Sequence, residues 1–306
     1  MSGISVRSWI SSIADRGREL LDLPLSTPQD PFAQLKAMCK DLVSQKGEAR
    51  GTAVAREVVR LWEILPEEDH LRFFEMMQND FSANRTEVRK AAEAFAKDPS
   101  EANLAVLTHA SEPARQELLR RINMAPGGTR AIVDMRETLL GLIKENRHLE
   151  PLDADMGHLL TSWFNRGFLE LRHIDWDTSA SILEKLIRYE AVHEIQGWDD
   201  LRRRLATDRK CFAFFHPAIP DDPLIFVEVA LVHGLADSVQ ALLAPEIDET
   251  APQKANTAIF YSISNCQSGL KGISFGNFLI KQVVEELKRE FPKLRQFATL
   301  SPIPGF

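Results

Sequence analysis

Cysteine is scarce in this chain, and its three cysteines form no motif. Cys39, Cys211 and Cys266 are odd in number and irregularly spaced over 306 residues. Disulfide-rich secreted domains and zinc sites need more cysteines, or cysteines and histidines at short fixed spacing. We therefore expect reduced thiols in an intracellular protein, with no metal site.

The chain also lacks an excess of basic residues and a long apolar run. Its 37 Lys and Arg are outnumbered by 44 Asp and Glu, which gives a formal net charge of −7. A nucleic-acid-binding surface needs concentrated positive charge, and a membrane-spanning helix needs roughly 20 apolar residues. We expect neither nucleic acid nor a membrane as a partner.

The first thirteen residues are rich in serine and include Arg7, as in organellar transit peptides. However, Asp15, Glu19 and Asp22 follow in the same amphipathic stretch, and transit peptides are poor in acids. We expect an ordinary first helix here and a protein of the bacterial cytoplasm.

Apolar residues recur at helical spacing over residues 30–158. In one stretch Val54, Val58 and Leu61 share a face. No unit of about 20–50 residues repeats, which excludes a solenoid. We predict an all-α domain over residues 1–158. Its helices either cover the second domain or pack against another subunit, and the helical pattern does not decide between the two.

The second half of the chain contains strand-like runs. Residues 211–215 and 224–232 are apolar and are joined by a proline-rich connection, as in an antiparallel pair. Residues 259–263 form a third run, followed by a glycine-bearing loop, an amphipathic helix and an extended segment over 294–300. Two strands joined by such a crossover helix lie parallel. The predicted fold class is α+β, with a mixed α/β domain over residues 159–306.

The loop before that helix carries three glycines, Gly269, Gly272 and Gly276. Glycine lets the backbone approach a ligand, and the free N–H groups at a helix start near Asn277 favour an anion such as a pyrophosphate. The order of the glycines matches neither the nucleotide P-loop nor the dinucleotide fingerprint. From the loop alone, an anion site and an ordinary strand-to-helix connection are equally good interpretations.

His216 and the run Arg202 to Arg204 are two further polar features. A histidine before a proline turn is more often structural than catalytic. Three successive arginines could attract phosphates, but a solvated helix end is the more common arrangement. We expect the common arrangement in both cases.

Longer segments resemble known families. Residues 267–272 resemble the coenzyme A pyrophosphate loop of the GNAT acetyltransferase superfamily. A resemblance to the malonyl-CoA decarboxylase family extends over nearly the whole chain. It is carried by HPAIPDDPLIFVEVAL (216–231), FYSIS (260–264), QSGLKGISFGNFLIK (267–281) and LSPIPGF (300–306).

The resemblance implies a GNAT acyltransferase-like second domain that converts malonyl-CoA to acetyl-CoA and CO₂. The coenzyme A thioester is then the substrate, and no cofactor is needed. Ser301 matches the family's catalytic serine, and some members carry an acid where Ser274 stands. The residues implied in coenzyme binding are Lys271, Gly272, Ile273, Ser274, Phe275, Gly276, Asn277 and Ile280, with Gln267 and Gly269 from the loop and Ser262 from the preceding strand.

One departure from the family pattern concerns the acid–base group. The family's catalytic histidine lies in a segment beyond the residue that matches Phe306, and none of the eight histidines here occupies that position. We therefore expect a C-terminally incomplete catalytic domain and little activity from this chain alone. Because the family's members are oligomers, the resemblance favours a homo-oligomer assembled through the helical domain. The alternatives are a GNAT-like acyl-CoA acyltransferase and a non-catalytic CoA-binding or assembly protein.

Overall fold

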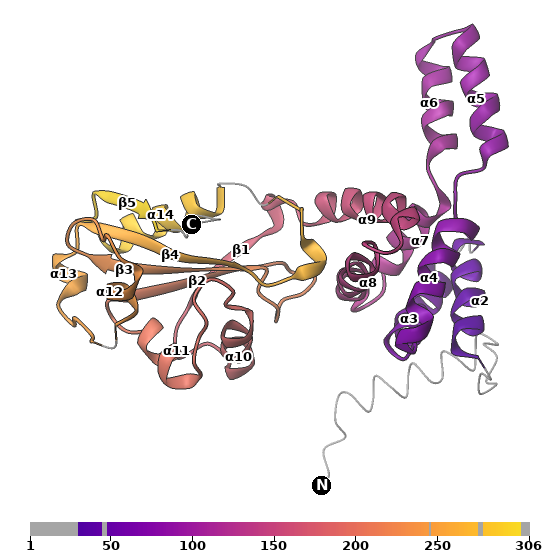
Figure 1. The fold of residues 1–306 in the computed structure, drawn as a ribbon. Coiled ribbons are helices and arrows are strands. Elements are labelled where there is room, and N and C mark those ends of the chain that lie inside the picture. The colour runs from indigo at the N-terminus through magenta and orange to yellow at the C-terminus, as the bar shows by residue number, and fades with distance from the viewer. Residues whose placement is uncertain (1–29, 45–47, 245, 275–277, 301–306) are drawn as a thin grey trace. The chain divides into compact units, whose positions relative to one another are not determined.

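The computed structural model describes residues 30–44, 48–244, 246–274 and 278–300 (Figure 1). The chain divides into two compact units, residues 1–159 and 160–306, and each is described by itself. The helix expected within the first 23 residues lies outside the described residues.

The first unit is built of α-helices, as the apolar spacing predicted. The boundary between the units falls within the last of them. The helices are α2 (Pro31–Ser44), α3 (Glu48–Glu63), α4 (Glu67–Asp80), α5 (Arg85–Lys97), α6 (Glu101–Ser111), α7 (Ala114–Asn123), α8 (Gly128–Leu142) and α9 (Glu150–Trp163), with a short 3₁₀ turn, η1 (Arg147–Leu149).

Local signals set where these helices begin. The side chain of Asn84 accepts hydrogen bonds from the first backbone N–H groups of α5, and Ser100 does the same for α6. Gly127 has a φ of 78°, a left-handed conformation that suits glycine, and it turns the chain into α8.

The core of the first unit lies between α2, α3, α4, α7 and α8. The Trp62 ring packs against Phe73 and Phe74, with centroids 5.1 and 5.6 Å away. Two ion pairs tie α9 to its neighbours: Arg115 Nε lies 2.6 Å from Asp155 Oδ2, and Arg136 Nε lies 2.7 Å from Asp153 Oδ1. Both arginines are buried, and a buried guanidinium needs a carboxylate partner because it has lost its contact with water.

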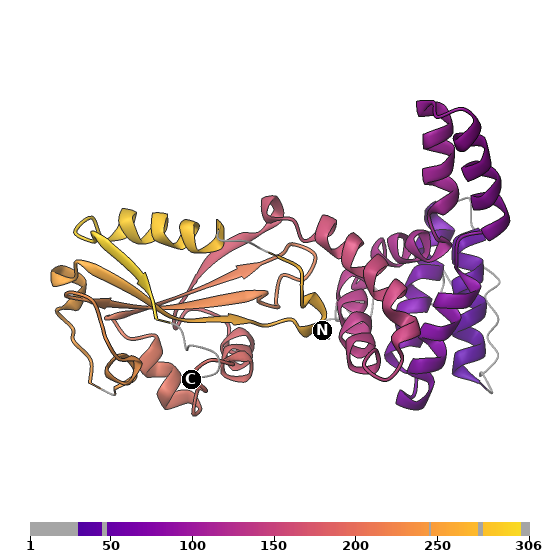
Figure 2. The same ribbon diagram turned by 45° about the horizontal axis from the view of Figure 1, so that its top comes forward.

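Helices α5 and α6 form a hairpin that extends away from the other helices of this unit (Figures 1 and 2). Both helices are described in full, and Ala91 is the only buried residue in them. Leu104 and Val106 of α6 are exposed. The hairpin therefore adds little to the core of the first unit.

The second unit contains a five-stranded sheet whose strands lie side by side in chain order. Its strands are β1 (Glu170–Ile174), β2 (Arg209–Phe215), β3 (Ile225–Val232), β4 (Thr257–Asn265) and β5 (Gln296–Thr299). The first four pair antiparallel, and β5 pairs parallel with β4. The predicted antiparallel pair, β2 with β3, and the predicted parallel pair, β4 with β5, are both confirmed. A helical part followed by a mixed α/β part, the predicted fold class, is confirmed as well.

Helices cover both faces of this sheet. Helix α14 (Phe278–Glu290) lies over one face, and α10 (Ala180–Tyr189) and α11 (Trp198–Arg204) lie over the other (Figures 1 and 2). The remaining short helices are η2 (Arg166–Phe168), α12 (Val239–Leu243), α13 (Ala251–Lys254) and η3 (Ser268–Leu270). Apolar side chains of α10 and α11, among them Leu183, Leu186 and Leu201, pack with Ala213 and Phe226 of the sheet.

A β-bulge interrupts the pairing of β3 with β4. Glu228 lies opposite Ser262, and Val229 lies opposite Phe260, so Tyr261 is the extra residue on β4. A bulge changes the direction in which the following side chains point and is common near functional sites. Here it comes just before the glycine-bearing loop.

Candidate functional site

The glycine-bearing loop joins β4 to α14, as predicted. After β4 ends at Asn265, the chain forms η3 and a turn at Lys271 and Gly272 before α14 begins at Phe278. Gly272 has a φ of 83°, a left-handed conformation that costs a residue with a Cβ roughly 1–2 kcal/mol. The turn therefore favours a glycine at this position.

The base of the loop is anchored, and its tip is exposed. The Gln267 side chain donates from Nε2 to the Pro223 carbonyl at 2.9 Å, and the Cys266 N–H donates to the Leu224 carbonyl at 2.9 Å. Gly269 is buried in η3. By contrast, the predicted coenzyme-binding residues Lys271, Gly272 and Ser274 are exposed, while Ile273 and Ile280 are half-buried.

The described residues thus bring most of the predicted coenzyme-binding residues together on one loop and the first turn of α14. Phe275, Gly276, Asn277 and the predicted catalytic Ser301 lie outside the described residues. Their assignment stays a prediction.

Ser262, the predicted site residue on β4, is buried on the sheet face that α10 covers. Its hydroxyl donates to the carboxylate of Glu190, with Oγ 2.8 Å from both Oε1 and Oε2. Ser264 donates to the same carboxylate at 3.0 Å. The Ser262 hydroxyl is therefore engaged within the protein, and its role towards coenzyme A stays a prediction.

A buried ion pair lies beside these serines. Arg204 Nη1 is 2.8 Å from Glu228 Oε2, and the two side chains are 3% and 1% exposed. Burial raises the pKa of Glu228 to about 7, although Arg204 opposes the shift. Glu228 Oε1 has no hydrogen-bond partner among the described residues. A carboxyl group in this state can hold a proton near neutral pH.

The solvated helix end expected at Arg202 to Arg204 is wrong for two of the three arginines. Arg202 is exposed, with its guanidinium carbon 5.6 Å from the centre of the Trp176 ring. Arg203 binds Asp208 at 2.7 Å, and Arg204 is buried against Glu228. For Arg204 no local pattern indicates this, because the carboxylate of Glu228 comes from a strand 24 residues later.

His216 makes two hydrogen bonds and packs against the rings of Phe164 and Phe168. Its Nε2 lies 3.1 Å from the Trp163 carbonyl, and its Nδ1 accepts from the Ala218 N–H at 3.1 Å. These partners require a neutral ring that carries its proton on Nε2. Burial lowers the pKa of His216, which agrees with the neutral form.

The three cysteines are buried and unpaired. Burial raises the pKa of each thiol, in Cys39 to about 12. A thiol in this state is a poor nucleophile.

Over the described ranges, no group of three or more histidine, cysteine or acidic side chains could hold a metal ion, and no helix is long and apolar enough to cross a membrane.

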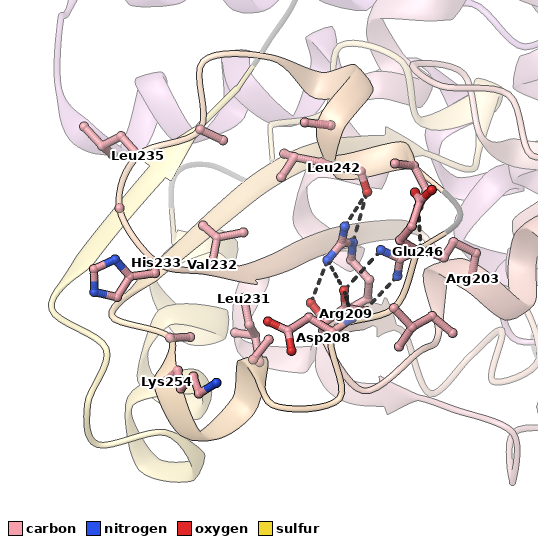
Figure 3. A pocket seen from close by; sticks show the side chains of 18 of the residues that line it. Arg203, Asp208, Arg209, Leu231, Val232, His233, Leu235, Leu242, Glu246 and Lys254 are labelled. Atoms are coloured by element: carbon pink, nitrogen blue, oxygen red, sulfur yellow. Dashed lines mark hydrogen bonds and ion pairs between the residues drawn. The ribbon is translucent and has the colours of Figure 1, made fainter.

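A cavity of about 700 Å³ lies at the other end of the sheet, between the end of β3 and helices α12 and α13. Figure 3 shows Arg203 and Arg209 both joined to Asp208 in its wall, away from His233. The two arginines also donate to backbone carbonyls of residues 242–244. Since these charges already have partners, and no predicted coenzyme-binding residue lines the cavity, the loop before α14 is the better candidate site.

Comparison with known proteins finds relatives over most of the chain. Residues 81–164 match the family model of the malonyl-CoA decarboxylase N-terminal domain, and residues 167–306 match that of the malonyl-CoA decarboxylase C-terminal domain.

Solved structures and curated proteins agree with these matches. The malonyl-CoA decarboxylase of Rhodopseudomonas palustris is 52% identical with a TM-score of 0.86, and the alignment covers 91% of this chain and 68% of that one. The enzyme of Agrobacterium vitis is 52% identical with a TM-score of 0.84, over 89% and 66%.

Mitochondrial malonyl-CoA decarboxylases of the goose Anser anser anser and of the rat are 38% and 37% identical over 63% and 65% of this chain. The chain spans 40% and 42% of these two curated relatives. The two family models and the solved structures point to one group of proteins. The chain belongs to the malonyl-CoA decarboxylase family.

Proposed function

We propose that this chain binds a coenzyme A thioester at the loop between β4 and α14 and takes part in the decarboxylation of malonyl-CoA to acetyl-CoA and CO₂. The observation that carries the proposal is the exposed turn at Lys271 and Gly272. It lies between a buried strand and the start of a 13-residue helix, an arrangement suited to a pyrophosphate.

Each part of the loop has a role in this proposal. Gly272 lets the backbone come close to the phosphates, and the N-terminal end of α14 attracts their negative charge. Lys271 adds a positive charge, and Ser274 adds a hydroxyl donor. Ile273 and Ile280 offer apolar surface to the less polar part of the coenzyme. Gln267 and the buried Gly269 hold the base of the loop in place.

The reaction needs little from the protein beyond positioning and donors. Cleavage of the bond between C2 of the malonyl group and its carboxylate releases CO₂ and leaves an enolate on the thioester. That enolate must be stabilised at its oxygen by preset donors and protonated on its carbon. On the family resemblance, we assign Ser301 to the stabilisation and protonation of the enolate.

We further propose that the protein is a homo-oligomer joined through its helical unit, located in the bacterial cytoplasm. The poorly buried α5–α6 hairpin supports the first part of this, because Leu104 and Val106 are exposed on it. The thioester is the substrate, and the proposed reaction requires no metal.

Titration with coenzyme A and a malonyl-CoA assay test this function. Calorimetry on the 306-residue chain is expected to show binding, which Lys271→Ala weakens without lowering the melting temperature. Turnover is followed as acetyl-CoA release, with the R. palustris enzyme as positive control. Failure of the chain to bind coenzyme A would contradict the assignment of the loop. Acetyl transfer to an amine would favour an acyltransferase instead.

A further inference from the structure

One carboxylate, that of Glu190, joins the segment after α10 to β4. Glu190 follows the last residue of α10 and is buried. Its Oε1 accepts hydrogen bonds from the backbone N–H groups of Val192 at 2.8 Å and His193 at 2.6 Å. Both of its oxygens accept from Ser262, and Oε2 also accepts from Ser264. The two backbone donors fix the carboxylate, and the fixed carboxylate holds the two serines.

The two serines lie on β4 directly after the β-bulge. Ser262 is the first residue after the extra residue of the bulge, and Ser264 is the next residue on the same face. The neighbourhood of Ser262 is polar although it is buried, since Glu228 lies directly opposite it, whereas Ser264 lies opposite Phe226. Small hydroxyl side chains contribute little apolar packing, so the hydrogen bonds to Glu190 add to the pairing of β4 with β3 in holding the strand here.

This stretch leads directly into the candidate coenzyme loop. Asn265 ends β4, and Gln267 and Gly269 follow within five residues of Ser264. The loop's other anchors, from Cys266 and Gln267 to Leu224 and Pro223, attach it to the segment before β3. The end of β4 is also paired with β3, through Ser264 with Phe226 and Asn265 with Ile225. Loss of the Glu190 contacts would remove the side-chain hydrogen bonds that attach this end of β4 to the segment after α10.

We propose that Glu190 is a positioning residue for the coenzyme site, an inference that rests on the proposed function. It acts through Ser262 and Ser264, whose hydrogen bonds to Glu190 hold β4 just after the bulge and thereby stabilise the path of the loop at Lys271 and Gly272. In this role Glu190 touches neither the coenzyme nor the reacting atoms.

The test compares Glu190→Ala with Glu190→Gln and with Asp208→Ala in the 306-residue chain. Asp208 is a buried carboxylate at the other end of the sheet, where Arg203 and Arg209 bind it, and it serves as the matched control. Each variant is measured for melting temperature, coenzyme A affinity by calorimetry, and amide hydrogen exchange over residues 262–274.

We expect Glu190→Ala to weaken coenzyme A binding roughly tenfold and to speed exchange over residues 262–270. Glutamine keeps the length and one acceptor oxygen, so Glu190→Gln is expected to restore most of the affinity. Asp208→Ala is expected to lower the melting temperature with unchanged affinity. If Glu190→Ala does not fold, the double variant Ser262→Ala, Ser264→Ala takes its place with the same expected loss.

Two results would overturn the inference: unchanged affinity in Glu190→Ala, or an equal loss of affinity in Asp208→Ala at an equal loss of melting temperature. If the wild-type chain binds no coenzyme A, the proposed function fails. The exchange measurement then decides separately, because unchanged exchange over residues 262–270 in Glu190→Ala would refute the positioning role.

Discussion

Replacing Glu228 with glutamine is expected to change how the stability of the second unit depends on pH. Glu228 is 1% exposed and has one oxygen on Arg204 and one without a partner among the described residues. Glutamine has nearly the same shape as the protonated glutamic acid and does not titrate. The variant therefore isolates the free-energy cost of ionising this one buried group.

The sign follows from proton binding. Burial raises the pKa of Glu228 in the folded state from 4.5 to about 7. Between these values the folded state binds more protons than the unfolded state, so the free energy of unfolding falls as the pH rises through this window. A difference of about 2.5 pKa units at 1.36 kcal/mol per unit gives about 3 kcal/mol. Relative to Glu228→Gln, the wild type is thus most stable near pH 4.5 and loses this advantage by about pH 7.

Urea unfolding between pH 5 and 8 measures the difference between the two proteins. Tryptophan fluorescence is a suitable signal because Trp163, Trp176 and Trp198 lie in the second unit. Effects of other titrating groups cancel in the comparison. A difference that stays constant with pH, or one that favours the wild type more as the pH rises, would refute the reasoning. The second result would mean that attraction to Arg204 outweighs the cost of burial.

Three further predictions concern His216 and the glycines. Because burial lowers the pKa of His216 below 6.5, its contribution to stability is expected to disappear as the pH falls below 6.5; melting curves of His216→Gln and wild type should then converge at low pH. Gly128→Ala would place a Cβ 1.9 Å from a backbone oxygen and is expected to destabilise the first unit by roughly 3 kcal/mol or more. Gly141→Ala in the same helix, where the space is open, is expected to stabilise the unit by up to about 1 kcal/mol. Equal melting temperatures for the two variants would contradict this prediction. Gly272→Ala and Gly197→Ala both force a positive φ on alanine and are expected to cost roughly 1–3 kcal/mol each, but only Gly272→Ala is expected to weaken coenzyme A binding in calorimetry.

Sequence patterns predicted the parts of the fold that depend on neighbouring residues. The helices of the first unit and the unit formed by β4, α14 and β5 follow from the spacing of their apolar residues, since one buried face imposes a period of 3.6 or 2. Strand β1 was not predicted. Its five residues, Glu170–Ile174, are mostly exposed or half-buried and form no apolar run.

The candidate site was predictable only in part, for the same reason. The loop at Lys271 and Gly272 is a local feature with a local signal. The contacts of Glu190 are not local, because its serine partners lie 72 and 74 residues away. A single acid after a helix carries no sign that its partners are on a distant strand, so the anchor of β4 needed the three-dimensional structure.

The order of the strands has a consequence for how the second unit folds. Each strand of the sheet pairs with the one before it in the chain, so a strand finds its partner already synthesised when it leaves the ribosome. The pair formed by β2 and β3 is the most local, because its partners run from Phe214 with Ile225 to Arg209 with Ala230, and local pairs favour fast folding. The parallel pairing of β5 with β4 must wait for α14 to cross the sheet. We expect β2 and β3 to pair first and the loop at Gly272 to take its shape only in the last step, when β5 docks.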